Sequence, residues 1–241
     1  MDSLYTSILR DAFGSDKPEY DAKTRSVLGA VVLAANPLSP SSIATFLGFN
    51  AEDVPRILSS VNPLLILHDD PNLPVQPFHK SFPDFSTDPT RRTNQRFHIS
   101  PSDHHARLLI GCLDLMNRTL EKNMCKLPDS VTNSDIDDLK ERTDKYINPA
   151  LRYACVSWYT HLTGLVDADM ISIRAPTVTP TLHKFLETKF LFWLEVLSVV
   201  GAVRNAVGAL QAMVDWLEVC KFLCSVLSPT LFRSNSGLTN S

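Results

Sequence analysis

Hydrophobic residues recur at helical spacing along most of this 241-residue chain, and turn-forming residues separate the helical stretches. The first 61 residues contain four such stretches, which we expect at residues 4–9, 19–35, 43–47 and 50–61. Asn36-Pro37 is expected to stop the second helix, Ser41 or Ser42 to cap the third, and Gly48 to end it.

The pattern changes from helical to extended after Pro63. Two short apolar runs, residues 64–68 and 75–79, flank the turn signal Asp69-Asp70-Pro71-Asn72, which predicts a β-hairpin. Three helices followed by a hairpin are typical of a winged helix. We therefore expect a winged-helix-like domain over residues 19–90, preceded by the end of an upstream helical segment at residues 1–18. Residues 81–85 should add a helical turn that ends at Asp88-Pro89.

The remainder is expected to form a helical bundle arm over residues 91–228 and a flexible tail at 229–241, so the predicted fold is mainly α. Helices are expected at residues 103–120, at 136–146 with Ser134 as the cap, and from Pro149 onward. The Pro- and Thr-rich stretch 175–180 is expected to be a connector. It should lead into a long helical region over 181–227 that is interrupted near Gly201.

Composition narrows the choice of partners. The formal net charge is only -3, so no global electrostatic field draws the chain to nucleic acid or to a membrane surface. The longest apolar run, residues 190–203, is shorter than the roughly 20 residues of a bilayer-spanning helix. The five cysteines are odd in number and scattered, and Met1 is followed by neither a basic region nor a continuous apolar run, so we expect no secretory signal and a cytoplasmic protein with reduced thiols.

A family resemblance rests on the segment Val-Gln-Pro-Phe-His-Lys-Ser-Phe-Pro-Asp-Phe-Ser-Thr-Asp-Pro at residues 75–89. It resembles the strand-His-x-Ser-Phe-x-Asp-Phe pattern in the winged-helix region of fungal NACHT-type (STAND) signalling NTPases. Later blocks resemble the same proteins, namely residues 96–99, 102–105 and 112–116, as do residues 25–40 and 43–47 before it. The resemblance covers about residues 4–165 and, more weakly, the rest of the chain.

The resemblance implies a switch. In such proteins a P-loop domain binds adenine or guanine nucleotide, the winged helix folds over it, and C-terminal repeats sense a partner. His79 matches the histidine that touches the diphosphate in the resting state of related ATPases. This implies that His79 senses the nucleotide phosphate in a full-length context, where ATP/ADP or GTP/GDP would be bound, with Ser81 and Asp84 shaping the turn that aims it.

The chain itself lacks the machinery for catalysis. It has no G-x-x-x-x-G-K-[ST] loop, so we expect no cofactor in this chain, no enzymatic activity and a relay role between an NTPase core and a repeat-sensor region. Two groups could suggest a metal or redox site: Asp103, His104 and His105 with Cys112, and the pair Cys220 and Cys224. Leu108 interrupts the first group and apolar residues surround the second, so we interpret both as structural and expect no metal.

Three alternatives stay open. A winged helix can bind DNA, but the third helix of the module has only Arg56 against Glu52 and Asp53. A free-standing adaptor could dock other proteins through its long C-terminal amphipathic helix, and self-association would follow if that apolar face were uncovered. His79 could instead be a histidine that only bonds nearby backbone.

Overall fold

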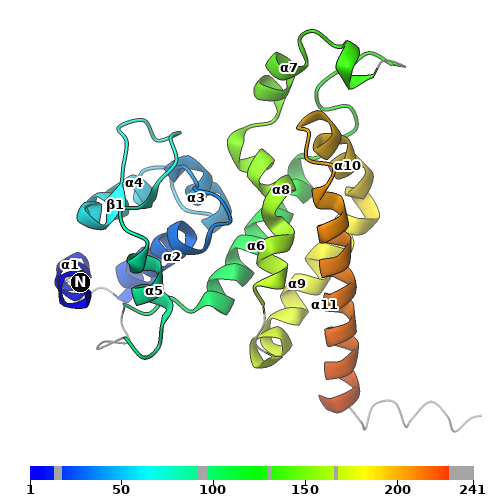
Figure 1. The fold of residues 1–241 in the computed structure, drawn as a ribbon. Coiled ribbons are helices and arrows are strands. Elements are labelled where there is room, and N and C mark those ends of the chain that lie inside the picture. Colours follow the sequence, from blue (N-terminus) through cyan, green and yellow to red (C-terminus); the bar gives the residue numbers. More distant parts are fainter. Residues whose placement is uncertain (14–17, 92–96, 130–131, 166–167, 228–241) are drawn as a thin grey trace, which may run out of the picture.

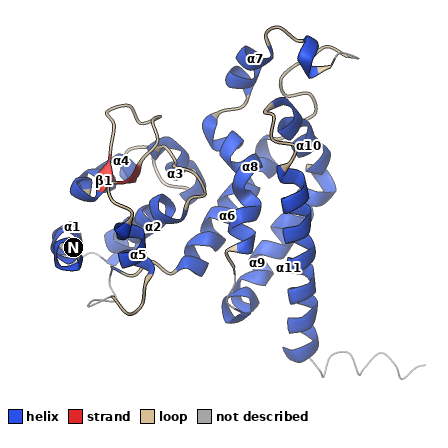
Figure 2. Cartoon of the chain, viewed as in Figure 1, coloured by secondary structure: helices blue, strands red, loops and turns tan. Residues whose placement is uncertain are grey.

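The computed structural model describes residues 1–13, 18–91, 97–129, 132–165 and 168–227. The side chains of residues 168–172 and 222–227 are not described. The expected tail, residues 229–241, and Arg96 of the family blocks lie outside the described residues. The described chain is mainly helical with one small antiparallel sheet, as predicted (Figure 2). None of the described helices is both long and apolar enough to cross a membrane.

Within residues 1–13 and 18–91, the described N-terminal part, five helices contribute to the hydrophobic core, which continues into the arm. They are α1 (Asp2–Ala12), α2 (Pro18–Leu33), α3 (Pro40–Leu47), α4 (Asp53–Ser60) and α5 (Ser81–Thr87). A 3₁₀ turn, η1 (Asn62–Leu64), leads from α4 into the hairpin. Val27, Ile43 and Ile57 are fully buried, one from each of the three central helices, so the apolar stripes that predicted these helices do face inward.

The hairpin exists but is much shorter than the two apolar runs indicated. Strands β1 (Leu65–Ile66) and β2 (Gln76–Pro77) pair antiparallel, with Leu65 opposite Pro77 and Ile66 opposite Gln76. Three prolines lie within seven residues here, at positions 71, 74 and 77, and each lacks the N–H that a longer ladder would need. One isolated bridge between Leu38 and Val75 supplements the pairing.

Two of the expected caps are wrong. Ser39 rather than Ser41 or Ser42 caps α3, because its Oγ accepts the N–H of Ser42 at 3.2 Å once Pro40 occupies the first helical position. Ser134 lies in the 3₁₀ turn η3 (Asn133–Asp135), and α7 (Leu139–Tyr146) starts after Asp138 instead. Gly48 does end α3, in the left-handed conformation with φ 66° that glycine adopts without strain.

The helical arm follows the N-terminal part, and its described residues form six α-helices. Besides α7, they are α6 (Pro101–Thr119), α8 (Pro149–Thr163), α9 (Ala168–Thr188), α10 (Phe190–Val199) and α11 (Asn205–Leu227). An aromatic cluster lies between α8, α9 and α10, where Trp158, Phe185 and Trp193 meet edge to face with centroids 5.5–6.0 Å apart. The indole N–H of Trp193 donates to the carbonyl of Cys155 at 2.8 Å, so this buried donor is satisfied.

The expected connector at residues 175–180 is wrong, because α9 runs through it as one helix with Pro176 and Pro180 inside. Each proline removes one helical hydrogen bond. The helix persists because Val178, Leu182 and Phe185 are buried against the arm, so the free energy of apolar burial offsets the lost bonds. The expected interruption near Gly201 is confirmed: α10 ends at Val199, and Gly201 turns with φ 71°.

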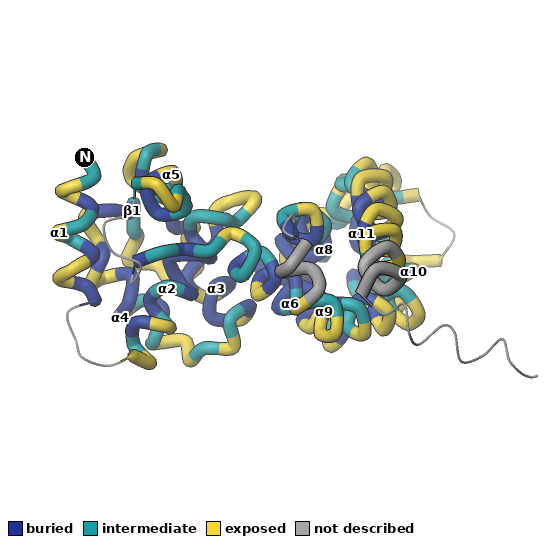
Figure 3. Tube along the Cα trace, turned by 90° about the horizontal axis from the view of Figure 1, so that it is seen from below, coloured by how far each residue is buried: buried dark blue, intermediate teal, exposed yellow. Residues whose placement is uncertain are grey.

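The N-terminal part and the arm lie side by side, and α6 faces α2 and α3 (Figures 1 and 3). Glycines permit this close approach. A methyl group on Gly111 of α6 would collide with the backbone of Phe46, and one on Gly29 of α2 would collide with the ring of His104. The two parts therefore share a close-packed junction.

Candidate functional site

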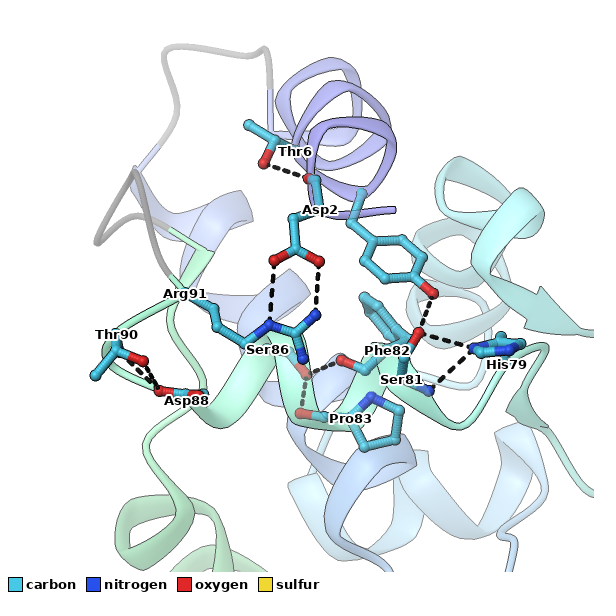
Figure 4. Close-up of polar contacts among 11 residues, drawn as sticks. Asp2, Thr6, His79, Ser81, Phe82, Pro83, Ser86, Asp88, Thr90 and Arg91 are labelled. Carbon is cyan, nitrogen blue, oxygen red and sulfur yellow. Dashed lines mark hydrogen bonds and ion pairs between the residues drawn. The ribbon is translucent and has the colours of Figure 1, made fainter.

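His79 lies two residues after the end of β2 and two residues before α5 begins (Figure 4), and its side chain is exposed. The preceding residue, Phe78, is 71% exposed, which is unusual for a phenylalanine. The sequence placed His79 at the end of the hairpin, and the structure agrees. An exposed imidazole beside an exposed aromatic ring forms a surface that other groups can reach.

The hydroxyl and the backbone N–H of Ser81 both contact the ring of His79 (Figure 4). Nδ1 of His79 lies 2.7 Å from Oγ of Ser81 and accepts the backbone N–H of Ser81 at 3.1 Å. Oγ of Ser81 in turn lies 2.8 Å from the hydroxyl oxygen of Tyr5 on α1. Because Nδ1 accepts from the backbone, the neutral ring carries its proton on Nε2. His79 thus presents Nε2–H, a directional donor, on the side opposite Ser81.

Helix α1 packs against α5, next to the residues that hold His79. Tyr5 packs against Phe82 and Phe85 of α5, with ring centroids 5.5 and 5.2 Å away. Asp2 accepts two hydrogen bonds from Arg91, at 3.1 Å to Nε and 2.6 Å to Nη2. These hydrogen bonds from Arg91 lower the pKa of Asp2. Helix α1 is therefore fastened to α5 and to the residues after it.

Ser81 and Asp84, the two residues expected to aim His79, have different roles in the structure. Ser81 contacts His79 directly and so positions it, as the resemblance implied. Asp84 lies in the first turn of α5, where a carboxylate interacts favourably with the helix dipole. Tyr5 and Arg91 were missed by the sequence reasoning, because Tyr5 contacts Ser81 across 76 residues and Arg91 contacts Asp2 across 89, and no local pattern marks such contacts.

A second hydrogen-bonded chain crosses the junction between the two parts. The backbone N–H of Ala35, just after α2, donates to the hydroxyl of Tyr153 on α8 at 3.0 Å. That hydroxyl lies 2.8 Å from Nε2 of His161, and Nδ1 of His161 lies 3.0 Å from Nδ1 of His105 on α6. When the Tyr153 hydroxyl donates to Nε2 of His161, Nδ1–H of His161 donates to Nδ1 of His105. Each of these hydrogen bonds then has one donor and one acceptor.

Burial keeps the two histidines of this hydrogen-bonded chain, and His104 nearby on α6, neutral. Loss of solvent lowers the pKa of His161 to about 3 and that of His104 to about 4, and it also lowers the pKa of His105. Desolvation likewise raises the pKa of Tyr153, so its hydroxyl keeps its proton. The junction is thus a neutral, buried polar network in which each partner depends on the next.

The residues weighed as metal ligands do not converge. The ring of His104 packs on Gly29, His105 bonds His161, and Asp103 pairs with Arg174. Cys112 is fully buried, and burial raises the pKa of its thiol. Cys220 is partly buried, and the side chain of Cys224 lies outside the described residues. Across the described ranges, no group of three or more His, Cys, Asp or Glu is arranged to hold a metal ion.

Three basic side chains of the N-terminal part, Lys23, Arg56 and Arg91, are paired with carboxylates. Asp53 accepts hydrogen bonds from Arg56 of α4 at 2.5 Å and from Lys23 of α2 at 3.3 Å. Arg91 is bound to Asp2, whereas the neighbouring Arg92 and Arg96 lie outside the described residues. These pairs place a carboxylate beside each of the three cations, which weakens their attraction for phosphates.

Comparisons with known proteins place the chain near one fungal protein. It is 23% identical over 236 residues to the Vegetative incompatibility protein HET-E-1 of Podospora anserina, and the match includes 88% of this chain. The chain spans only 16% of that protein's length. No family model and no solved structure matches the chain. The match supports at most a distant relationship to NACHT-type proteins, which agrees with a signalling role.

Proposed function

We propose that this chain is a non-catalytic relay region of a NACHT-type signalling NTPase. In this proposal the N-terminal part is a winged-helix-like module that senses the nucleotide state of an NTPase core, and the arm passes that state to a sensor region. The observation that carries the proposal is the orientation of the exposed His79, whose Nδ1 is held by Ser81, so that Nε2–H lies on the opposite side of the ring; Tyr5 in turn holds the Ser81 hydroxyl.

This geometry suits a phosphate oxygen as the partner of His79. A phosphate needs directional N–H donors, and Nε2–H is available because Nδ1 is already occupied by the backbone of Ser81. A single histidine gives little affinity by itself. Most of the affinity for the nucleotide would come from a P-loop in another domain, since this sequence contains no such loop. His79 would therefore report the nucleotide rather than capture it.

The close-packed junction supports the relay part of the proposal. Gly29 and Gly111 let α2 and α3 pack directly on α6, and the Ala35–Tyr153–His161 chain links the two parts through buried hydrogen bonds. A displacement of the N-terminal part would have to move α6 and α8 or break this network. Such a junction suits a rigid lever better than two independently moving modules.

The test uses a full-length parent that contains a P-loop domain. In the His79→Ala variant we expect bound nucleoside diphosphate to dissociate faster, and activation to require less stimulus, because the resting state loses one phosphate contact. His68→Ala is the matched control, since His68 is an exposed histidine next to the other strand of the same hairpin. Nucleotide release would be followed with a fluorescent diphosphate.

Ser81→Ala separates positioning from contact. It keeps the imidazole but removes the hydroxyl between Tyr5 and Nδ1, so it should speed diphosphate release less than His79→Ala does. If His79→Ala and His68→Ala release nucleotide at the same rate as the parent, His79 is not a phosphate sensor and the proposal fails.

A further inference from the structure

Helix α11 lies at the edge of the arm, and much of its length is exposed (Figures 1 and 3). Four side chains on this helix remain 44–73% exposed, at spacings of three, four and three residues. They are Val207, Leu210, Val214 and Leu217. Residues so spaced lie on one side of a helix, so they form a continuous surface that we call the α11 stripe.

The stripe is not the face by which α11 packs into its own bundle. That face consists of other residues, which are all buried: Ala206, Ala209, Ala212, Met213 and Trp216. They contact chiefly α8, with further contacts to α9 and α10. A helix in a soluble domain needs one apolar face to join its core. α11 has a second one, and a second face of this kind usually marks an interaction surface.

The spacing specifies a helix as the occupant. Val207 and Val214 are seven residues apart, as are Leu210 and Leu217, which gives a valine at each a position and a leucine at each d position of a heptad pattern. Such a seam is filled by the a and d residues of a second helix. An extended peptide or a flat surface would not match a period of seven.

The charges beside the stripe favour a second copy of the same helix in the opposite direction. Three exposed or partly buried residues flank the seam at intervals of seven: Arg204 just before the helix, Gln211 in the middle and Glu218 near its end. In an antiparallel pair related by a two-fold axis, Val207 faces Leu217 and Leu210 faces Val214 of the other copy. Arg204 then meets Glu218 of the other copy at both ends.

We propose that two copies of this chain associate through the α11 stripe as an antiparallel helix pair. A parallel pair would leave Arg204 and Glu218 without opposite charges, because the residues on the other side of the seam, Ala206 and Met213, are uncharged and buried in the bundle. The antiparallel pair also opposes the two helix dipoles favourably. This inference does not depend on His79, which lies in the N-terminal part.

The first experiment measures the mass of the 241-residue chain by sedimentation equilibrium over a range of concentrations. We expect a reversible dimer. Leu210→Glu should weaken it by about a hundredfold, because the substituted residue enters a two-fold interface twice and each copy should cost at least tenfold. Leu73→Glu is the matched control: Leu73 is 44% exposed, close to the 46% of Leu210, but lies in the hairpin loop.

The second experiment tests direction by exchanging charges. Arg204→Glu and Glu218→Arg should each weaken the dimer, and the double variant should restore it. Rescue within one chain is impossible, since 14 residues of helix separate the two side chains by about 21 Å. A chain that stays monomeric up to about 0.1 mM, a dimer insensitive to Leu210→Glu, or a double variant without rescue would each overturn the proposal.

Discussion

Gly111 on α6 lies against the backbone of Phe46 on α3, so closely that a Cβ atom on Gly111 would approach the Phe46 Cα to 2.9 Å and the carbonyl oxygen more closely still. Gly111→Ala should therefore destabilise the chain by about 1–3 kcal/mol, because backbone cannot move aside as a flexible side chain can. Urea unfolding followed by circular dichroism would measure the change.

Gly208→Ala provides the control for that measurement. Gly208 is also inside a helix, but the added Cβ would meet only the ring of Tyr159, at 3.2 Å. Alanine has the higher helix propensity, by up to about 1 kcal/mol, so this variant should lose far less stability or gain some. Equal losses in the two variants would show that α3 and α6 are not in close contact.

Tyr153→Phe should expose the dependence of the junction on one hydroxyl. The variant leaves the N–H of Ala35 without its acceptor and His161 without a partner at Nε2, which should cost about 1–3 kcal/mol. Tyr159→Phe, on the same helix, serves as the control because Tyr159 makes no hydrogen bond within the described ranges. Hydrogen exchange at the Ala35 amide should accelerate in Tyr153→Phe only, and unchanged protection would contradict the contact.

The buried histidines make stability depend on pH in a defined direction. His161 and His104 have folded-state pKa values of about 3 and about 4, below the 6.5 of an unfolded histidine, so the unfolded chain binds more protons between those values. Stability is fully present above pH 6.5 and falls as the pH drops toward 4. Each histidine contributes up to about 1.4 kcal/mol per pH unit, which gives a loss of roughly 2–4 kcal/mol from pH 7 to pH 5.

Urea unfolding at several pH values would check this slope. His161→Gln keeps a polar group in the buried space but cannot take up the proton, so its stability should vary less with pH than that of the parent. His183→Gln removes an exposed histidine and should leave the slope as it was. A parent stability that is flat between pH 7 and pH 5 would show that the histidines are not buried as described.

Arg91→Gln should release the charge interaction that fastens α1. Since hydrogen bonds from Arg91 are the main cause of the low pKa of Asp2, the pKa of that carboxyl should rise toward 3.8 in the variant. An NMR titration of the Asp2 carboxyl carbon would follow it. Arg142→Gln, which removes a similar partner from Asp138 at the N-terminal cap of α7, should leave the Asp2 titration unchanged.

Much of the fold could be predicted because a helix with one buried face requires apolar residues at a regular spacing of three or four positions, which can be read from the sequence. The stripe of Val27, Leu28 and Val31 faces the core as its spacing indicated, and Gly48 and Gly201 end or interrupt helices where expected. The stretch around Pro176 and Pro180 was misassigned, since local proline rules count only the lost hydrogen bond. The burial of Val178 and Phe185 that overrides them depends on helices distant in sequence.

The candidate site was predictable only in part, for a similar reason. His79 and Ser81 are two residues apart, so a short motif could mark them together. Tyr5 and Arg91 join the site through tertiary packing, and the Tyr153–His161–His105 chain assembles residues from two helices of the arm. In the sequence those three are an ordinary tyrosine and two isolated histidines.

The way Ser81 holds His79 determines what kind of signal that residue could read. A donor fixed on Nε2 by a backbone contact needs no positive charge, so its interaction with an anion would depend on angle and distance more than on ionic strength. A lysine in the same place would attract any nearby anion through its long-range field. His79 would instead distinguish a correctly docked oxygen from one displaced by an ångström or two.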